Sequence, residues 1–306
     1  MSFRDQRAER DRAVGSQGDA DRRMLLTGAT IVTMGPAGVV RGDILLRSST
    51  IEAIGPGLAD QVGEEAIVID ASGTIIVPGL IDSHLHAWEG QLRGVAPDAD
   101  FGEYMSITHG GLALHYRPED LAIAERLSAA QAINAGTTTF IDNSHNSRSR
   151  GHSDAAIEAL LSTGIRAVYA AGSAQVGDHE AQLPTDLLRL REEYFSSGQD
   201  LVTLRMFDVM PSIEQWRFAD EHGFDLCAEM GFWVPDVEKL GESGLMRPGH
   251  TYNHCSGFSD AMWGAIADSG AAVNLVQVRL AVRARRVLPR ASGRPARHSD
   301  RHQLRQ

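Results

Sequence analysis

The chain has 306 residues, of which 42% are hydrophobic and 23% are charged, enough apolar material for a sizeable core. This ordinary composition excludes a mainly disordered, collagen-like or disulfide-stapled protein. The formal net charge of −11 argues against a dedicated nucleic-acid binder.

The sequence pattern in the first part of the chain predicts a small β-subdomain. Residues 1–23 are charged and aperiodic, which predicts a disordered leader, and Met24 could equally be the true start. Short strand-like runs with Gly and Pro between them follow, with no helical period. They predict an N-terminal β-subdomain over residues 24–73, with strands at 24–34, 43–54 and 66–69.

From Thr74 onward, strand-like runs alternate with amphipathic stretches. Repeated β–α units predict a parallel sheet that is covered on both faces. Seven such strands favour a (β/α)8 TIM-like barrel over an open sheet, and this α/β domain is predicted over residues 74–276. The strands are predicted at 74–82, 137–142, 165–171, 201–209, 224–230, 250–255 and 271–276, and the helices at 118–134, 153–163, 180–195, 212–222 and 258–269.

The eighth strand of such a barrel is not visible, so the predicted barrel is incomplete. After Val276 no strand or helix period is found, and residues 277–306 contain nine Arg and one Asp, a local charge of +8. The preceding residues carry −19. This abrupt change predicts a truncated or frame-shifted product with an Arg-rich tail. A binding protein that uses its basic tail is an alternative, which the acidic body and the lack of tail aromatics disfavour.

The strongest chemical signal is the histidine pair at the end of the first predicted barrel strand. Alternate residues of a strand point to the same side, so His84 and His86 project together. In a barrel, the carboxyl ends of the strands form the active-site face. Two imidazoles that converge there suit a divalent metal such as zinc or iron.

With these residues, the sequence resembles the amidohydrolase superfamily, in particular its cytosine deaminase and triazine hydrolase-like branch. The resemblance runs from about Met24 to Val276. The segments that carry it are PGLIDSHLH (78–86), HAWEGQLRG (86–94), AGTTTFID (135–142) and NHCSGFSD (253–260).

The resemblance implies metal ligands at fixed places in the barrel. They are the paired histidines of strand 1, a His ending strand 5, a His ending strand 6 and an Asp ending strand 8. His84 and His86 match the pair, and His254 matches the strand-6 position. Glu229 stands where the strand-5 His is expected, and a carboxylate there can bind the metal or move a proton. The strand-8 Asp has no counterpart.

The resemblance also implies how many metal ions are bound and what they do. Members with two metals usually bridge them through a carboxylated Lys on strand 4, but the single lysine, Lys239, lies outside that strand. One divalent ion, Zn²⁺ or Fe²⁺, is therefore expected. It would activate a water for hydrolysis of a non-peptide carbon–nitrogen bond, in the deamination of a heterocycle or a related dechlorination. His254 and Glu229 are the predicted catalytic residues, and a catalytically incompetent remnant is the alternative.

Substrate contacts are predicted at Trp88, Arg93 and His145, which follow the first two barrel strands. The expected partner is a small-molecule substrate, with no nucleic acid and no membrane, and a homo-oligomer is left open. The two cysteines form no disulfide framework, and no apolar run reaches the ~18 residues of a membrane span. These features predict a cytoplasmic protein.

Overall fold

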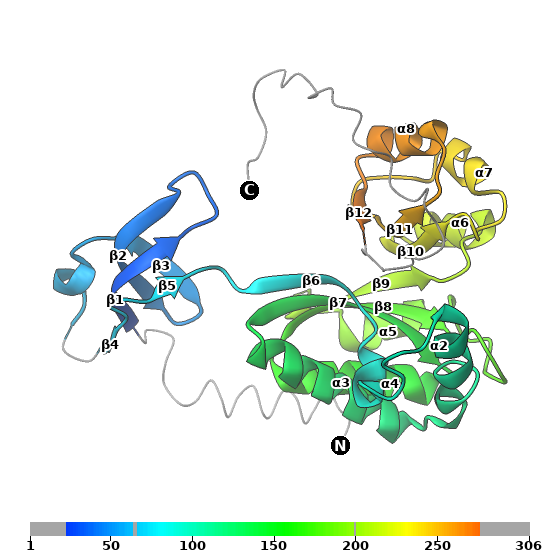
Figure 1. Ribbon diagram of the computed structural model, residues 1–306, viewed down its shortest axis with the longest axis horizontal. Helices are drawn as coiled ribbons and strands as arrows, with labels where there is room; N and C mark the ends of the chain where they lie inside the picture. Colours follow the sequence, from blue (N-terminus) through cyan, green and yellow to red (C-terminus); the bar gives the residue numbers. More distant parts are fainter. Residues whose placement is uncertain (1–22, 64–65, 199, 276–306) are drawn as a thin grey trace.

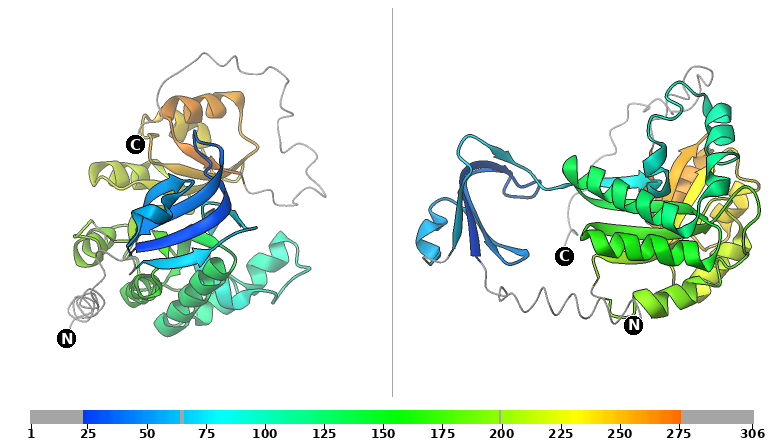
Figure 2. Two further views of the ribbon diagram at one scale, coloured as in Figure 1. Left: turned by 90° about the vertical axis from the view of Figure 1, so that its left-hand side faces the viewer. Right: turned by 90° about the horizontal axis from the view of Figure 1, so that it is seen from below.

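The computed structural model describes residues 23–63, 66–198 and 200–275, which form two β-sheets (Figure 1). The small N-terminal sheet is set apart from the larger sheet and joined to it by an extended segment (Figures 1 and 2). Residues 1–22 of the predicted leader and the predicted tail at 277–306 lie outside the described residues. The change of composition after Val276 lies outside them too.

The N-terminal sheet is mixed, with strand order β3-β2-β1-β4 and with β5 paired to β1. The single strand predicted at 43–54 is in fact a hairpin of two antiparallel strands, β2 and β3. The chain reverses between them at Ser48, which adopts a left-handed φ of 53°. A single turn of 3₁₀ helix, η1, follows. The bounds are β1 (Arg23–Val32), β2 (Val39–Arg47), β3 (Thr50–Gly55), η1 (Leu58–Gln61), β4 (Ile67–Asp70) and β5 (Ile75–Ile76).

The larger sheet confirms an incomplete TIM-like barrel. Its seven described strands are parallel and follow one another in chain order from β6 to β12. The strand predicted at 74–82 is two strands, since β5 joins the N-terminal sheet and only β6 joins the barrel. The bounds are β6 (Leu80–Leu85), β7 (Thr137–Ser147), β8 (Arg166–Ser173), β9 (Val202–Asp208), β10 (Leu226–Gly231), β11 (Thr251–Ser256) and β12 (Ala272–Asn274).

Helices connect the barrel strands, and α3 and α4 pack side by side along the outer face of the sheet (Figure 2). Their ends follow local rules. Ser212 and Ser259 accept backbone N–H groups at the starts of α6 and α8, and Gly270 ends α8 with a left-handed φ of 69°. The bounds are η2 (Ala87–Leu92), α2 (Phe101–Ile107), η3 (Leu112–His115), α3 (Pro118–Asn134), α4 (Arg150–Thr163), α5 (Leu187–Tyr194), α6 (Ile213–Glu221), α7 (Val237–Glu242) and α8 (Asp260–Ser269).

The main apolar core lies between the strands and these helices. Within it, Trp216 of α6 stacks on Tyr252 of β11, with ring centroids 5.6 Å apart and an interplanar angle of 6°. A separate buried cluster of Ala170, Phe207 and Cys227 comes from three neighbouring strands, β8 to β10. Burial of these large side chains removes apolar area from water and is the main stabilising contribution to the barrel.

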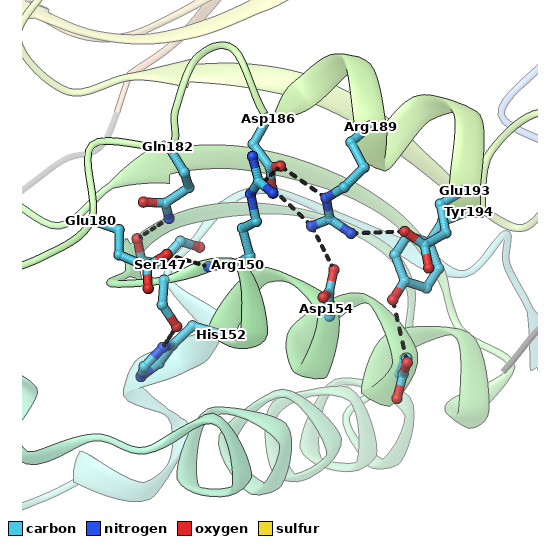
Figure 3. A network of polar contacts seen from close by, with 12 residues as sticks. Ser147, Arg150, His152, Asp154, Glu180, Gln182, Asp186, Arg189, Glu193 and Tyr194 are labelled. Atoms are coloured by element: carbon cyan, nitrogen blue, oxygen red, sulfur yellow. Dashed lines mark hydrogen bonds and ion pairs between the residues drawn. The ribbon is translucent and has the colours of Figure 1, made fainter. Parts of the chain in front are cut away.

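An arginine network ties α5 to α4 on the outside of the barrel (Figure 3). Arg189 donates hydrogen bonds of 2.8 Å to Asp186, Asp154 and Glu193. Asp186 is 3% exposed and also pairs with Arg150 at 3.1 Å. Because the network neutralises a buried carboxylate, loss of its central arginine leaves a costly charge inside the protein.

Asp208, at the end of β9, makes stability depend on pH. It accepts hydrogen bonds from Trp216 Nε1 (3.0 Å) and the Ser212 backbone N–H (3.4 Å). Burial raises the pKa of Asp208 from 3.8 to about 7. Between about pH 4 and pH 7, the folded protein therefore holds a proton that the unfolded chain releases. Stability falls as pH rises through this window, by up to about 1.4 kcal/mol per pH unit.

We expect Asp208→Asn to remove this part of the pH dependence, because the carboxamide keeps the acceptor oxygen and does not ionise. Urea unfolding at pH 5, 6, 7 and 8 measures the free energy of unfolding of both proteins. The advantage of the variant should grow up to about pH 7 and then level off. Asp98→Asn, at an exposed carboxylate, is the matched control. Equal pH slopes in wild type and D208N would contradict the assignment.

Candidate metal centre

The paired histidines of β6 lie at the carboxyl end of the barrel strands. His84 and His86 are two residues apart, so the strand alternation places both side chains on one side. Their Nε2 atoms face each other at 3.3 Å, and their ring centroids are 5.0 Å apart. The side chain of Asp82 accepts the His84 backbone N–H at 3.1 Å and steadies the strand at this point.

Glu229 of β10 and His254 of β11 meet the pair from the other side of the barrel. Glu229 Oε1 lies 3.6 Å from His84 Nε2, and Glu229 Oε2 lies 2.5 Å from His254 Nε2. The rings of His84 and His254 are 4.9 Å apart. The structure thus brings together the four residues that the sequence nominates as metal ligands.

A backbone irregularity positions His254. His254 and Cys255 adopt left-handed φ angles of 66° and 48°, conformations that cost about 1 kcal/mol or more in residues other than glycine. Strict strand alternation would place Asn253 and His254 on opposite faces. The left-handed turn instead lets both side chains reach Glu229.

The donor set fits a divalent metal ion. One ligand atom each from His84, His86 and Glu229 lies within 4.8 Å of the other two. Two imidazole nitrogens and a carboxylate oxygen are the donors of many catalytic zinc and iron(II) sites. His86 Nδ1 lies 2.8 Å from the backbone oxygen of Asn143, which can only accept. The proton of His86 is therefore on Nδ1, and the lone pair of Nε2 is free for a metal.

The charge states also suit a metal. Burial lowers the pKa of His84 to about 4, so the imidazole is neutral at pH 7. Burial raises the pKa of Glu229, but the hydrogen bond with His254 and the nearby imidazoles outweigh it and leave this pKa below its ordinary value. A metal needs deprotonated ligands, and both residues meet that condition at neutral pH.

Two of the predicted substrate-contact residues lie in a buried aromatic cluster behind His86. His145 Nε2 is 3.1 Å from His86 Nδ1, and the His145 ring stacks on His109 at 5.1 Å. Trp88 is fully buried and sets its ring edge against His145 and His109. Contact of His145 or Trp88 with a substrate remains a prediction.

Arg93 and Lys239, which the sequence analysis also considered, lie at the surface. Arg93 is exposed and donates to Gln131 of α3 at 3.3 Å, and its contact with a substrate also remains a prediction. Lys239 lies on α7 and pairs with Asp236 at 3.0 Å, so the single lysine of the chain does not bridge metals at this centre.

Three asparagines that surround the ligands were not nominated as site residues from the sequence. Asn143, Asn253 and Asn274 come from β7, β11 and β12, and the first two are fully buried. Asn253 precedes His254 in the segment NHCSGFSD, and strand alternation by itself places neighbouring side chains on opposite faces. A second missed group is the buried pair of Glu125 and Asp142, whose pKa values burial raises.

Comparisons with known proteins support a hydrolase fold. Residues 75–209 match the family model described as the Amidohydrolase family. The 5-methylthioadenosine/S-adenosylhomocysteine deaminase of Thermococcus kodakarensis is 32% identical over 140 residues, 46% of this chain and 31% of that protein. The 5'-deoxyadenosine deaminase of Methanospirillum hungatei is 33% identical over 183 residues, 60% of this chain and 39% of that protein.

Among solved structures, a mutant atrazine chlorohydrolase from Arthrobacter aurescens, complexed with zinc and atraton, superposes with a TM-score of 0.68. The match covers 82% of this chain and 64% of that chain at 20% identity, and it shows a shared fold. The chain thus spans 31% and 39% of the length of the two curated relatives. In the part of the chain that the structure describes, no helix is long and apolar enough to cross a membrane.

Proposed function

Because this chain belongs to the amidohydrolase superfamily, we propose that it catalyses the hydrolytic deamination of a nitrogen heterocycle with one divalent metal ion, Zn²⁺ or Fe²⁺. One observation carries the proposal: ligand atoms of His84, His86 and Glu229 converge within 4.8 Å at the strand ends. The names of the two curated relatives, both deaminases of adenosine-type nucleosides, favour deamination over dechlorination.

The net reaction adds water to a ring carbon, breaks its bond to the amino nitrogen and releases ammonia. When bound, the metal supplies a water of lowered pKa and a Lewis acid for the attacked group. His84 Nε2, His86 Nε2 and Glu229 Oε1 would hold it. The chain's own residues must then supply the proton transfers and the orientation.

We propose that Glu229 and His254 move the proton. The carboxylate is ionised at neutral pH, and its Oε2 can take a proton from the attacking water. His254 Nε2, 2.5 Å away, can share that proton and help return it to the departing nitrogen. We assign His254 this proton-transfer role next to the metal ligands.

The cytoplasm is the proposed location. Cys227 and Cys255 are both free, buried thiols, which is what a reducing compartment maintains. Burial raises the pKa of both thiols, to about 11 and about 12, so neither is a reactive thiolate at neutral pH.

The test uses the full chain, stripped of metal by a chelator and then given Zn²⁺ or Fe²⁺. We expect about one equivalent of bound metal and metal-dependent ammonia release from 5'-deoxyadenosine or 5-methylthioadenosine. Chloride release from a chlorinated triazine is measured in parallel. His179→Ala, at an exposed histidine outside the centre, is the control and should behave as wild type.

Each outcome decides between the alternatives. Ammonia release supports the proposed deaminase, and chloride release alone would replace it with a dechlorinase. Metal binding with neither product would identify a metal-binding chain without this activity. Absence of metal binding would overturn the proposal altogether.

A further inference from the structure

Three asparagine side chains, Asn143, Asn253 and Asn274, form a hydrogen-bonded chain next to the candidate metal centre. We call it the carboxamide triad. Asn253 Nδ2 donates to Asn143 Oδ1 and to Glu229 Oε1, both at 3.3 Å. Asn274 Nδ2 donates to Asn253 Oδ1 at 2.9 Å and to the backbone oxygen of Ser83 at 2.7 Å. The triad therefore links β7, β11 and β12 to β6.

The backbone carbonyl of Ser83 can only accept a hydrogen bond, and this fixes the orientation of the Asn274 and Asn253 amides. The carbonyl of Ser83 has no proton, so the Asn274 group that faces it must be the NH₂. That NH₂ also faces Asn253, so Asn253 must present its oxygen there. The NH₂ of Asn253 is then left to face Glu229 and Asn143.

The oxygen of Glu229 that receives this N–H is Oε1, the one proposed as the metal ligand. Oε1 is the oxygen nearer His84, at 3.6 Å from its Nε2. The donated hydrogen bond favours the carboxylate orientation in which Oε1 faces His84 while Oε2 contacts His254. Asn143 contributes twice, since its backbone oxygen accepts from His86 Nδ1 while its side chain accepts from Asn253.

We infer that the carboxamide triad is a positioning relay, in which Ser83 of β6 sets the amide of Asn274, Asn274 sets Asn253, and Asn253 orients Glu229 for the metal. The inference rests on the metal centre of the proposed function. Neither Asn274 nor Ser83 hydrogen-bonds any of the four candidate ligands in the described part of the chain. They act through Asn253, as outer partners of metal ligands commonly do.

Asn274→Asp tests the relay at a residue outside the ligand set. The new carboxylate can only accept, so it should attract the NH₂ of Asn253 and turn the amide oxygen toward Glu229 Oε1. We expect the zinc affinity, measured by chelator competition on the full chain, to fall about 10- to 100-fold. A nearby negative charge acting by itself would do the opposite and tighten cation binding.

Asn146→Asp is the matched control. Asn146 is a buried asparagine of β7 outside the triad, and its acceptor, the Ala113 carbonyl, keeps a hydrogen bond of 2.9 Å from Arg148. This variant adds the same charge and should bind zinc at least as tightly as wild type. Asn274→Ala frees the amide of Asn253 without adding charge, and its affinity should fall by a smaller factor of about 3 to 10.

For each variant, zinc affinity is measured together with the unfolding midpoint of the metal-free protein in chelator. The midpoint shows whether the variant is folded, so that weaker zinc binding can be attributed to the orientation of Glu229. If N274D is unfolded, N274A decides. Weaker zinc binding by a folded variant supports the relay. Wild-type affinity in N274A, or tighter binding by N274D, overturns the relay and leaves the proposed function standing. If wild type binds no zinc, the proposed function fails and the relay fails with it.

Discussion

Replacing His86 with alanine is expected to abolish zinc binding, with an affinity loss of more than about 100-fold. Loss of an outer partner typically costs about 10- to 100-fold, and removal of a ligand should cost more. His86 supplies one of the three converging ligand atoms, and its Nε2 lies 3.3 Å from that of His84. Competition against a chelator of known affinity measures the loss, and ammonia release should vanish with it.

The unfolding midpoint of metal-free H86A should stay close to that of wild type, because an imidazole at the rim of the barrel contributes little apolar burial. His179→Ala is again the matched control, since that histidine is exposed and its Nδ1 lies 3.1 Å from the carbonyl oxygen of Gly177, outside the centre. Wild-type zinc affinity in H86A would show that the metal, if bound, lies elsewhere in the protein.

The largest stability effect is expected from Arg189→Leu, which should lower the free energy of unfolding by about 2–4 kcal/mol. Arg189 is the shared partner of Asp186, Asp154 and Glu193 (Figure 3). Without it, the buried carboxylate of Asp186 keeps only Arg150, whose side chain is 65% exposed. Urea unfolding at pH 7 measures the change.

Arg191→Leu provides the comparison on the same helix. Arg191 donates to the backbone oxygen of His222 at 2.7 Å and lies over the ring of Phe224 at 4.5 Å, but it neutralises no buried carboxylate. This variant should lose no more than about 1 kcal/mol. Equal losses in the two variants would show that the buried charge of Asp186 is not what makes Arg189 important.

Much of the fold could be predicted from local patterns. The helix predicted at 118–134 has the observed bounds of α3, because Pro118 favours the first helical position and Gly136 follows the end. The α5 helix is shorter than the predicted 180–195, since the residues before it form turns. Helices α2 and α7 were missed, because they have only seven and six residues and show too little period.

The four residues predicted as metal ligands lie next to one another in the structure, and their roles remain predictions. Strand alternation was sufficient for His84 and His86, since both lie on one strand two residues apart. Glu229 and His254 were nominated through the family resemblance, and the structure places them against the pair. Asn253 was not found, because its access to Glu229 depends on the left-handed backbone of His254.

The sequence by itself determined the alternation of strands and helices and the two histidines at the end of one strand. These features depend on periods of two and 3.6 residues within a single segment. Only the tertiary structure decided which side chains from different strands meet and which way each amide faces. The relay begins where Asn274 reaches the carbonyl of Ser83, 191 residues away in the chain. Such a contact depends on the curvature of the seven-stranded sheet, which brings its two end strands, β6 and β12, together and which no local pattern encodes.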